Sequence, residues 1–175
     1  MLLMILGISG TPGVGKSTAA SLLRRMGIEV VDINALVLQQ GFSLGTEGDC
    51  VVADIDALRE HLSEYEGLVV VEGHLAHHVA DVCIVVRCSP WVVEQRLRER
   101  GYPENKVREN AEAEALDVIL VEAVEMCKRV YEVDATHMSP SALASHIVRI
   151  IGAERAGTPI SGYEPGRVDF TGYLL

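Results

Sequence analysis

Residues 2–17 decide the fold of this chain. They read Leu2-Leu-Met-Ile-Leu-Gly-Ile8, then Ser9, then Gly10-Thr-Pro-Gly-Val-Gly-Lys16-Ser17. The first stretch is a continuous apolar run, typical of a strand buried on both faces of a parallel sheet. The second fits G-x-x-x-x-G-K-[ST], in which glycines let the backbone fold around a phosphate with its N–H groups pointing inward. Together they predict a buried strand, a phosphate-binding loop and a helix whose N-terminus faces the bound anion.

Four side chains are candidates for phosphate chemistry. In this motif Lys16 can reach the β and γ phosphates of a nucleoside triphosphate, and the Ser17 hydroxyl can complete the shell of a Mg²⁺ ion. Glu72 ends the third apolar strand, where P-loop proteins place an acidic residue that orients Mg²⁺ or its water. A carboxylate that only caps the following turn is the alternative for Glu72. We expect His74 to be a polar group near the γ-phosphate.

Neither the histidines nor the cysteines form a recognisable zinc motif. His74, His77 and His78 lie close together, but only the i,i+3 and i,i+4 pairs share a helical face, and the sequence identifies no further ligand. We therefore do not favour a zinc site. The cysteines lack C-x-x-C spacing and are predicted to be small buried apolar residues in a reducing compartment. They are Cys50, Cys83, Cys88 and Cys127.

A basic segment precedes the break Gly101-Tyr-Pro103. Arg96 and Arg100 are four residues apart and share a helical face, whereas Arg98 points away and is expected to pair with Glu94. The first two arginines suit a small lid that closes on a triphosphate, excludes water and stabilises the charge of a transferring phosphoryl group. A surface helix with many salt bridges is the alternative.

The remaining chain alternates between strand and helix patterns, which favours an α/β fold. We predict a three-layer α/β/α arrangement of a five-stranded parallel sheet with a short helical lid. The predicted strands are Leu2–Ile8, Ile28–Val31, Leu68–Val71, Val82–Val86 and Val130–Val133. The predicted helices are Ala19–Met26, Asn34–Gln40, Asp54–Ser63, Pro90–Arg100, Glu104–Lys128 and Ser139–Ile151, with a loop at Gly41–Gly48.

The domain is expected to span residues 1–151, followed by a C-terminal tail at 152–175. The tail is rich in glycine and proline and shows no periodicity, so we interpret it as loosely attached. Two alternatives stay open. The tail either folds over the domain or a neighbouring molecule, with Tyr163, Phe170 and Tyr173 as anchors, or it is disordered in solution.

Composition limits the classes of partner. The chain has 175 residues, 49% of them hydrophobic, and a net charge of -10 from 15 Lys plus Arg against 25 Asp plus Glu. This balance argues against broad binding to a nucleic-acid backbone, which needs a basic surface. No apolar stretch reaches about 18 residues, the length that spans a membrane. We expect a cytoplasmic protein that binds no membrane.

Several stretches resemble the adenylate kinase isoenzyme 6 family, a branch of the P-loop nucleoside monophosphate kinases that includes archaeal adenylate kinases and nuclear ribosome-assembly ATPases. The likeness runs from about Leu2 to Ile150 and leaves the tail uncovered. It is carried by Gly10-Thr-Pro-Gly-Val-Gly-Lys-Ser-Thr18, Asp49-Cys50 with Asp54 and Asp56, Glu72-Gly-His74, Arg96-Leu-Arg-Glu-Arg-Gly-Tyr102, Lys106 and Glu109-Asn110-Ala-Glu112.

The resemblance implies a P-loop kinase fold, an activity and a set of site residues. It implies Mg²⁺-dependent transfer from ATP to AMP, ATP + AMP = 2 ADP, with ATPase activity coupled to maturation of the small ribosomal subunit. It places the monophosphate-binding part at about 30–53 and the lid at about 99–109. ATP would contact Gly13, Gly15, Lys16, Ser17, Thr18 and Arg100, and the catalytic residues would be Lys16, Arg100, Glu72 and His74. The implied protein partner is a basic small-subunit ribosomal protein, which an acidic chain suits electrostatically.

The chain departs from adenylate kinases in its acceptor region. Adenylate kinases generally hold the AMP phosphate with arginines from the monophosphate-binding part and from just after the third strand. Here no Lys or Arg occurs from Ile33 to Asp54, and Leu75 and Ala76 follow His74. Two hypotheses result. The chain is an adenylate kinase-type phosphotransferase, or it is an ATP-driven assembly factor that acts through a basic ribosomal protein, with AMP phosphorylation secondary.

Overall fold

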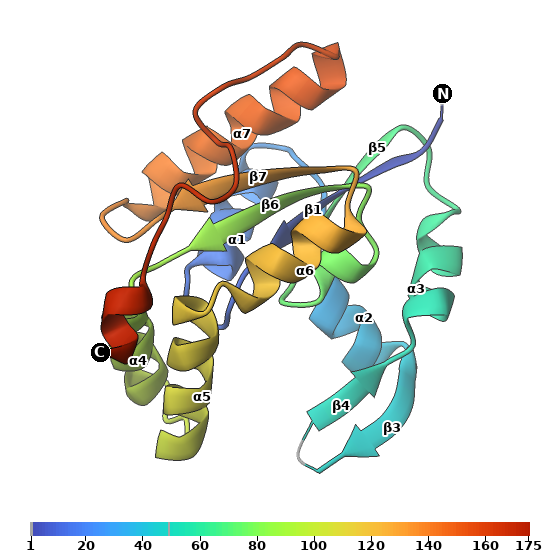
Figure 1. Cartoon of the computed structure of the whole chain (residues 1–175). Coiled ribbons are helices and arrows are strands. Elements are labelled where there is room, and N and C mark those ends of the chain that lie inside the picture. The colour runs from blue at the N-terminus through green and yellow to red at the C-terminus, as the bar shows by residue number, and fades with distance from the viewer. Residues whose placement is uncertain (1, 49) are drawn as a thin grey trace.

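A parallel five-stranded sheet, in the order β2-β5-β1-β6-β7, forms the centre of the computed structural model (Figure 1). The structure describes residues 2–48 and 50–175; Asp49, part of the resemblance, lies outside them. The sheet strands are β1 (Met4–Ser9), β2 (Val30–Asp32), β5 (Leu68–Glu72), β6 (Val82–Arg87) and β7 (Arg129–Asp134). They match the five predicted strands to within a few residues at each end. The predicted sheet is therefore confirmed.

Helices cover both faces of this sheet. They are α1 (Lys16–Arg25), α2 (Ile33–Gln39), α3 (Ile55–Leu62), α4 (Pro90–Glu99), α5 (Glu104–Ala115), α6 (Val118–Met126) and α7 (Pro140–Ala156), with short 3₁₀ turns η1 (Ala76–His78) and η2 (Thr171–Leu174). Alternate residues of β1 pack on opposite faces, because successive side chains of a strand point to opposite sides. Leu6 and Ile8 pack in the cluster that contains α1 and α7, and Ile5 packs in the cluster that contains α2 and α3. The predicted three-layer α/β/α fold is confirmed.

The predicted loop at Gly41–Gly48 is wrong. The structure instead has an antiparallel hairpin of β3 (Ser43–Glu47) and β4 (Cys50–Ala53), which projects below α2 (Figure 1). Every residue of β3 is exposed, so the strand buries no apolar face and shows no alternation of apolar and polar residues. Backbone pairing defines the hairpin, and hydrophobic periodicity could not indicate it. The sequence signal that could have indicated it is the pair Gly48-Asp49, because two residues of this type are typical of a hairpin turn.

The predicted helix at Glu104–Lys128 is also wrong as a single element. It divides into α5 and α6 at Asp117, whose φ of 57° lies in the left-handed region. Aspartate tolerates this conformation better than most residues. The Asp117 carboxylate accepts a hydrogen bond from the buried Arg87 guanidinium, which holds the chain in the break. The interruption therefore depends on a partner 30 residues away in the sequence.

The segment after α7 packs on the domain and is not loosely attached. Helix α7 itself continues to Ala156, past the predicted end at Ile151. Tyr163 is buried, and its carbonyl oxygen accepts a hydrogen bond from the backbone N–H of Glu132 in β7 at 2.8 Å. The Tyr173 hydroxyl donates to Glu94 Oε1 of α4 at 2.7 Å. The tail thus runs from β7 to the helices α4 and α5 (Figure 1).

The cysteines follow the predicted burial with one exception. Cys83 and Cys88 are buried and Cys127 is half-buried, but Cys50 is exposed on the hairpin, so the prediction for Cys50 is wrong. The described cysteines are all free thiols. Within residues 2–48 and 50–175, no helix has both the length and the apolar character needed to cross a membrane.

Candidate active site

The phosphate-binding loop lies between the end of β1 and the start of α1, and its glycines are required by its shape. Gly13 and Gly15 have φ of 94° and 108°, in the left-handed region that side chains disfavour. At Gly10 a Cβ atom would lie 2.6 Å from the carbonyl oxygen of Val86. Gly15 also precedes Lys16, the first residue of α1, so the N-terminal N–H groups of this helix open toward the loop.

Lys16 is buried at the base of this loop. Its Nζ donates to the carbonyl oxygen of Thr11 at 3.3 Å. Burial lowers the pKa of Lys16 to about 8, although the negative charge of Glu72 works in the opposite direction. A cation that has lost its water in this way gains when a polyanion enters, because the incoming charge replaces the lost hydration.

Ser17 and Glu72, both predicted to serve a Mg²⁺ ion, are in contact. The Ser17 hydroxyl donates to Glu72 Oε1 at 2.7 Å, and Glu72 is the buried last residue of β5. The sheet brings them together because β1 and β5 are parallel neighbours, with Ile8 opposite Glu72. A hydroxyl and a carboxylate are the hard oxygen donors that Mg²⁺ prefers, so this pair fits the ion that the family implies.

His74 follows Glu72 by two residues and is exposed. It lines a pocket of about 220 Å³ together with Pro12, Gly13, Gly15, Lys16, Ser17, Thr18, Asn34, Arg100 and Tyr102. The ring borders this pocket and so remains accessible. The pKa of His74 is lowered to about 4. The main cause is the loss of water around the ring, and the second is the positive charge of Lys16. His74 is therefore a neutral imidazole at pH 7.

A second pocket continues from the first and shares Gly15, Thr18 and Arg100 with it. It is lined by Val14, Gly15, Thr18, Arg96, Arg100, Ala135, Met138, Ser139, Pro140 and Leu143. The connection from β7 to α7 forms one wall of this second pocket. The sequence patterns predicted neither this wall nor the positions of Asn34 and Tyr102 in the first pocket. A usable signal existed, because ligands of parallel sheets bind outside the carboxyl ends of the strands.

The arginines of α4 take different positions. Arg96 Nη1 donates to the carbonyl oxygen of Gly13 at 2.9 Å, so this side chain holds the loop from outside. Arg100 borders both pockets. The predicted pair of Arg98 with Glu94 is confirmed at 3.3 Å, and Arg98 also contacts Glu104 on the surface.

A buried ionic network joins the loop to α5. Arg87, at the end of β6, donates from Nε to Glu114 Oε1 at 2.8 Å and from Nη1 to Glu132 Oε1 at 2.7 Å. The Thr11 hydroxyl donates to the other oxygen of Glu114. Sequence reasoning missed this network, because Thr11 and Glu114 are 103 residues apart. One end of α5 is thereby fixed to the backbone segment that accepts from Lys16.

Comparison with known proteins places the chain in a family. A family model described as an AAA domain matches residues 6–117. The protein named "Putative adenylate kinase" of Methanothermobacter thermautotrophicus is 49% identical, over 96% of this chain and 98% of its own length. A protein of the same name from Natronomonas pharaonis is 44% identical, over 98% and 100%. The chain belongs to this archaeal adenylate kinase family. The resemblance noted from the sequence is thereby confirmed.

Solved structures support the fold of this family member. Shikimate kinase from Acinetobacter baumannii superposes with a TM-score of 0.59 at 17% identity, covering 87% of this chain and 95% of that one. A Thermus thermophilus protein, TT1252, gives a TM-score of 0.54 at 20% identity, covering 93% and 100%. At these identities the likeness concerns the fold alone. Family membership and fold together make the protein a P-loop kinase of the nucleoside monophosphate kinase type.

Proposed function

We propose that the protein transfers the γ-phosphoryl group of ATP to AMP, ATP + AMP = 2 ADP, with Mg²⁺ as cofactor. The observation that carries this proposal is the convergence of Lys16, Ser17 and Arg100 on one pocket, with Glu72 hydrogen-bonded to Ser17 behind it. That pocket continues into the second, more apolar one. The first suits the phosphates of ATP, and the second suits its nucleoside.

Each residue has a role that follows from its position. Lys16 binds the β and γ phosphates, together with backbone N–H groups from Gly13 to Thr18. Arg100 stabilises the charge that spreads over the transferring group, and neutral His74 offers a hydrogen bond beside it. Ser17 and Glu72 would hold Mg²⁺, and Glu72 would do so through water. The ion, when bound, neutralises phosphate charge and orients the transferring group.

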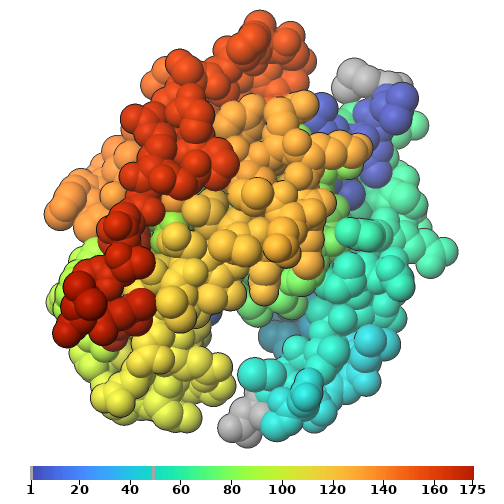
Figure 2. Space-filling view, in the orientation of Figure 1, coloured from blue at the N-terminus to red at the C-terminus, as the bar shows by residue number. Residues whose placement is uncertain are grey.

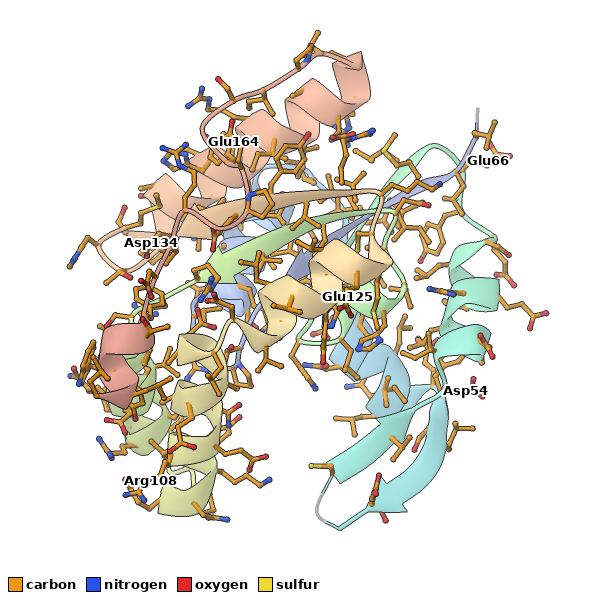
Figure 3. All side chains as sticks on the ribbon, in the orientation of Figure 1. Asp54, Glu66, Arg108, Glu125, Asp134 and Glu164 are labelled. Carbon is orange, nitrogen blue, oxygen red and sulfur yellow. The ribbon has the colours of Figure 1, made fainter. Side chains whose placement is uncertain are left out.

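We place the acceptor in the hollow between α5 and the β3–β4 hairpin, which Figure 2 shows open to solvent. Its walls correspond to the monophosphate-binding part at 30–53 and the lid at 99–109. Arg59 is committed elsewhere, because its Nη2 donates to the carbonyl oxygen of His78 at 2.6 Å. Arg108 lies on the side of α5 that faces away from the hairpin (Figure 3). Asn34, which lines the phosphate pocket, is our candidate for contacting the acceptor phosphate.

The lack of a basic residue between Ile33 and Asp54 favours a second candidate function. In this alternative the protein hydrolyses ATP during assembly of the small ribosomal subunit, and its main ligand is a basic ribosomal protein. The net charge of -10 would attract such a partner. AMP would then be a poor acceptor, and water would receive the phosphoryl group.

Production of ADP from ATP, measured with and without each nucleoside monophosphate, tests the two candidates. We expect AMP to raise the rate more than CMP, UMP or GMP, and to yield two ADP for each ATP consumed. If AMP has no effect and a basic ribosomal protein raises the rate, the second candidate replaces the first.

Replacing Arg100 with Ala is expected to lower kcat by about 100-fold while changing the Kd of ATP by less than about fivefold, because Arg100 acts mainly on charge that develops during transfer. The measurements are steady-state kinetics and equilibrium binding of ATP. Arg98→Ala is the matched control, since Arg98 lies on the same helix but pairs with surface glutamates. Equal losses in kcat and in ATP affinity for Arg100→Ala would contradict the assigned role.

A further inference from the structure

Three potential metal ligands meet on the face of the sheet covered by α6. They are His77 and His78 of η1 and Glu122 of α6, and their nearest ligand atoms all lie within 4.8 Å of one another. His77 Nε2 lies 2.8 Å from Glu122 Oε2, and His78 Nε2 lies 4.0 Å from the same oxygen. The sequence identifies the two histidines but no further ligand. In the folded chain the third ligand is Glu122, which lies 45 residues after His77.

The hydrogen bonds of His77 orient its ring for binding a cation. Its Nδ1 lies 2.8 Å from Ser9 Oγ, and the Ser9 hydroxyl donates to the carbonyl oxygen of His74 at 3.2 Å. The Ser9 hydroxyl can donate to Nδ1 or accept from it, so either ring nitrogen can carry the proton of the neutral imidazole. In the Nδ1–H tautomer the lone pair of Nε2 faces Glu122, which is the form that a metal ion binds. Nε2 and Glu122 Oε2 are 2.8 Å apart and have either a proton or a metal ion between them.

Burial fixes the position of the His77 ring. Only 1% of its side chain is exposed, so the ring has little freedom to move. The contact of Nδ1 with Ser9 Oγ at 2.8 Å resembles the arrangement of metal-binding histidines, in which the second ring nitrogen is held by a fixed oxygen.

We propose that His77, His78 and Glu122 form a binding site for a borderline-soft divalent transition ion such as Zn²⁺. Two imidazoles and one carboxylate are a ligand set for Zn²⁺ rather than for Mg²⁺, which prefers oxygen. Ligand atoms of a tetrahedral zinc site are about 3.3 Å apart. Here Glu122 Oε2 lies 2.8 Å from His77 Nε2 and 4.0 Å from His78 Nε2, and all three ligand atoms lie within 4.8 Å of one another, so small side-chain shifts would bring them to that spacing. His78 and Glu122 are partly exposed, so an ion can enter from solvent and water completes the coordination.

The site is separate from the nucleotide pocket but connected to it. Ser9 is the last residue of β1 and directly precedes Gly10 of the phosphate-binding loop. His74 shares the Ser9 hydroxyl and lines the phosphate pocket. Helix α6, marked by Glu125 in Figure 3, crosses the sheet at this point. A bound ion would therefore tie α6 to the segment that carries Glu72 and His74.

Titration of the metal-stripped full-length protein with Zn²⁺, in the presence of millimolar Mg²⁺ and without nucleotide, tests the proposal. We expect one ion per chain with a Kd on the order of 1 µM, and a rise in Tm of about 5 °C at saturation. Co²⁺ in place of Zn²⁺ should give visible absorption bands of a low-coordinate site. His77 is left intact, because replacing this buried ring would disturb the fold.

Two variants and two controls make the result decisive. Glu122→Gln and His78→Ala should each weaken Zn²⁺ binding at least 10-fold and abolish the Co²⁺ bands, with unchanged circular dichroism. His137→Ala removes an exposed histidine outside the cluster and should bind like the wild type. Lys16→Ala should also retain binding, which separates the site from that of MgATP. Binding weaker than about 100 µM, or binding that Glu122→Gln leaves unchanged, would overturn the proposal.

Discussion

Replacing Lys16 with Met is expected to lower kcat/KM by about 1,000-fold or more, while making the nucleotide-free protein more stable at pH 7. The loss of activity follows from removing the buried lysine of the phosphate-binding loop. The gain in stability follows from the same burial. A charged amine with 6% exposure has lost most of its hydration, and its hydrogen bond to Thr11 replaces little of it.

The sign of the pH effect follows from the two pKa values of Lys16. The pKa is about 8 in the folded chain and 10.5 for an unperturbed lysine, as in the unfolded chain, so the unfolded state binds the proton more tightly. Below pH 8 both states are protonated, and the folded state carries the full penalty. From pH 8 to 10.5 the penalty declines, and stability rises with pH. Lys16→Met should therefore be more stable by about 3 kcal/mol at pH 7, and this advantage should nearly vanish by pH 10.5.

Urea unfolding at pH 7 and pH 10, together with the ADP-coupled assay, measures both effects. Lys128→Met is the matched control, because Lys128 is exposed and forms a surface ion pair with Asp81. It should leave activity unchanged. A Lys16→Met protein that keeps its activity would contradict the assignment of the phosphate site. One that is less stable than the wild type at pH 7 would contradict the stated cost of burying the amine.

Replacing Arg87 with Met is expected to lower the free energy of unfolding by about 3–5 kcal/mol, the largest effect on stability that we predict for this chain. Arg87 is 1% exposed, and its guanidinium contacts the carboxylates of Glu114, Glu132 and Asp117. Methionine nearly fills the volume but leaves two buried carboxylates without a counter-charge. The Phe170 ring of the tail, 5.4 Å from the guanidinium, also loses its cation–π contact.

The Arg87→Met substitution should also lower activity, because Glu114 connects Arg87 to the phosphate-binding loop. Its carboxylate holds both Arg87 and the Thr11 hydroxyl, so releasing one side loosens the other. Adding Glu114→Gln to Arg87→Met removes one uncompensated charge and is expected to restore part of the lost stability. Arg98→Met, at an exposed ion pair, should not change the urea midpoint measurably. Equal midpoints for Arg87→Met and the wild type would refute the importance of the network.

Short-range patterns determined the central part of this fold. The apolar run that forms β1, the phosphate-binding loop and the following helix were predicted because their residues are contiguous, and their geometry follows from glycine conformations and strand burial. The sheet strands could be recognised for the same reason. Lys16 and Ser17 were proposed as site residues from the motif, and Glu72 and His74 from their place at the end of a strand.

The tertiary structure alone decided the features that join distant segments or lack a pattern. The β3–β4 hairpin buries no apolar face along β3, so periodicity could not reveal it. The break at Asp117, the bond from Thr11 to Glu114 and the approach of Glu122 to His77 each pair residues 30 to 103 positions apart. The sequence by itself determined the position of the phosphate-binding loop, because one short contiguous motif makes it. Which helix is fixed against the loop, and which carboxylate meets the histidines, depends on how the whole chain packs.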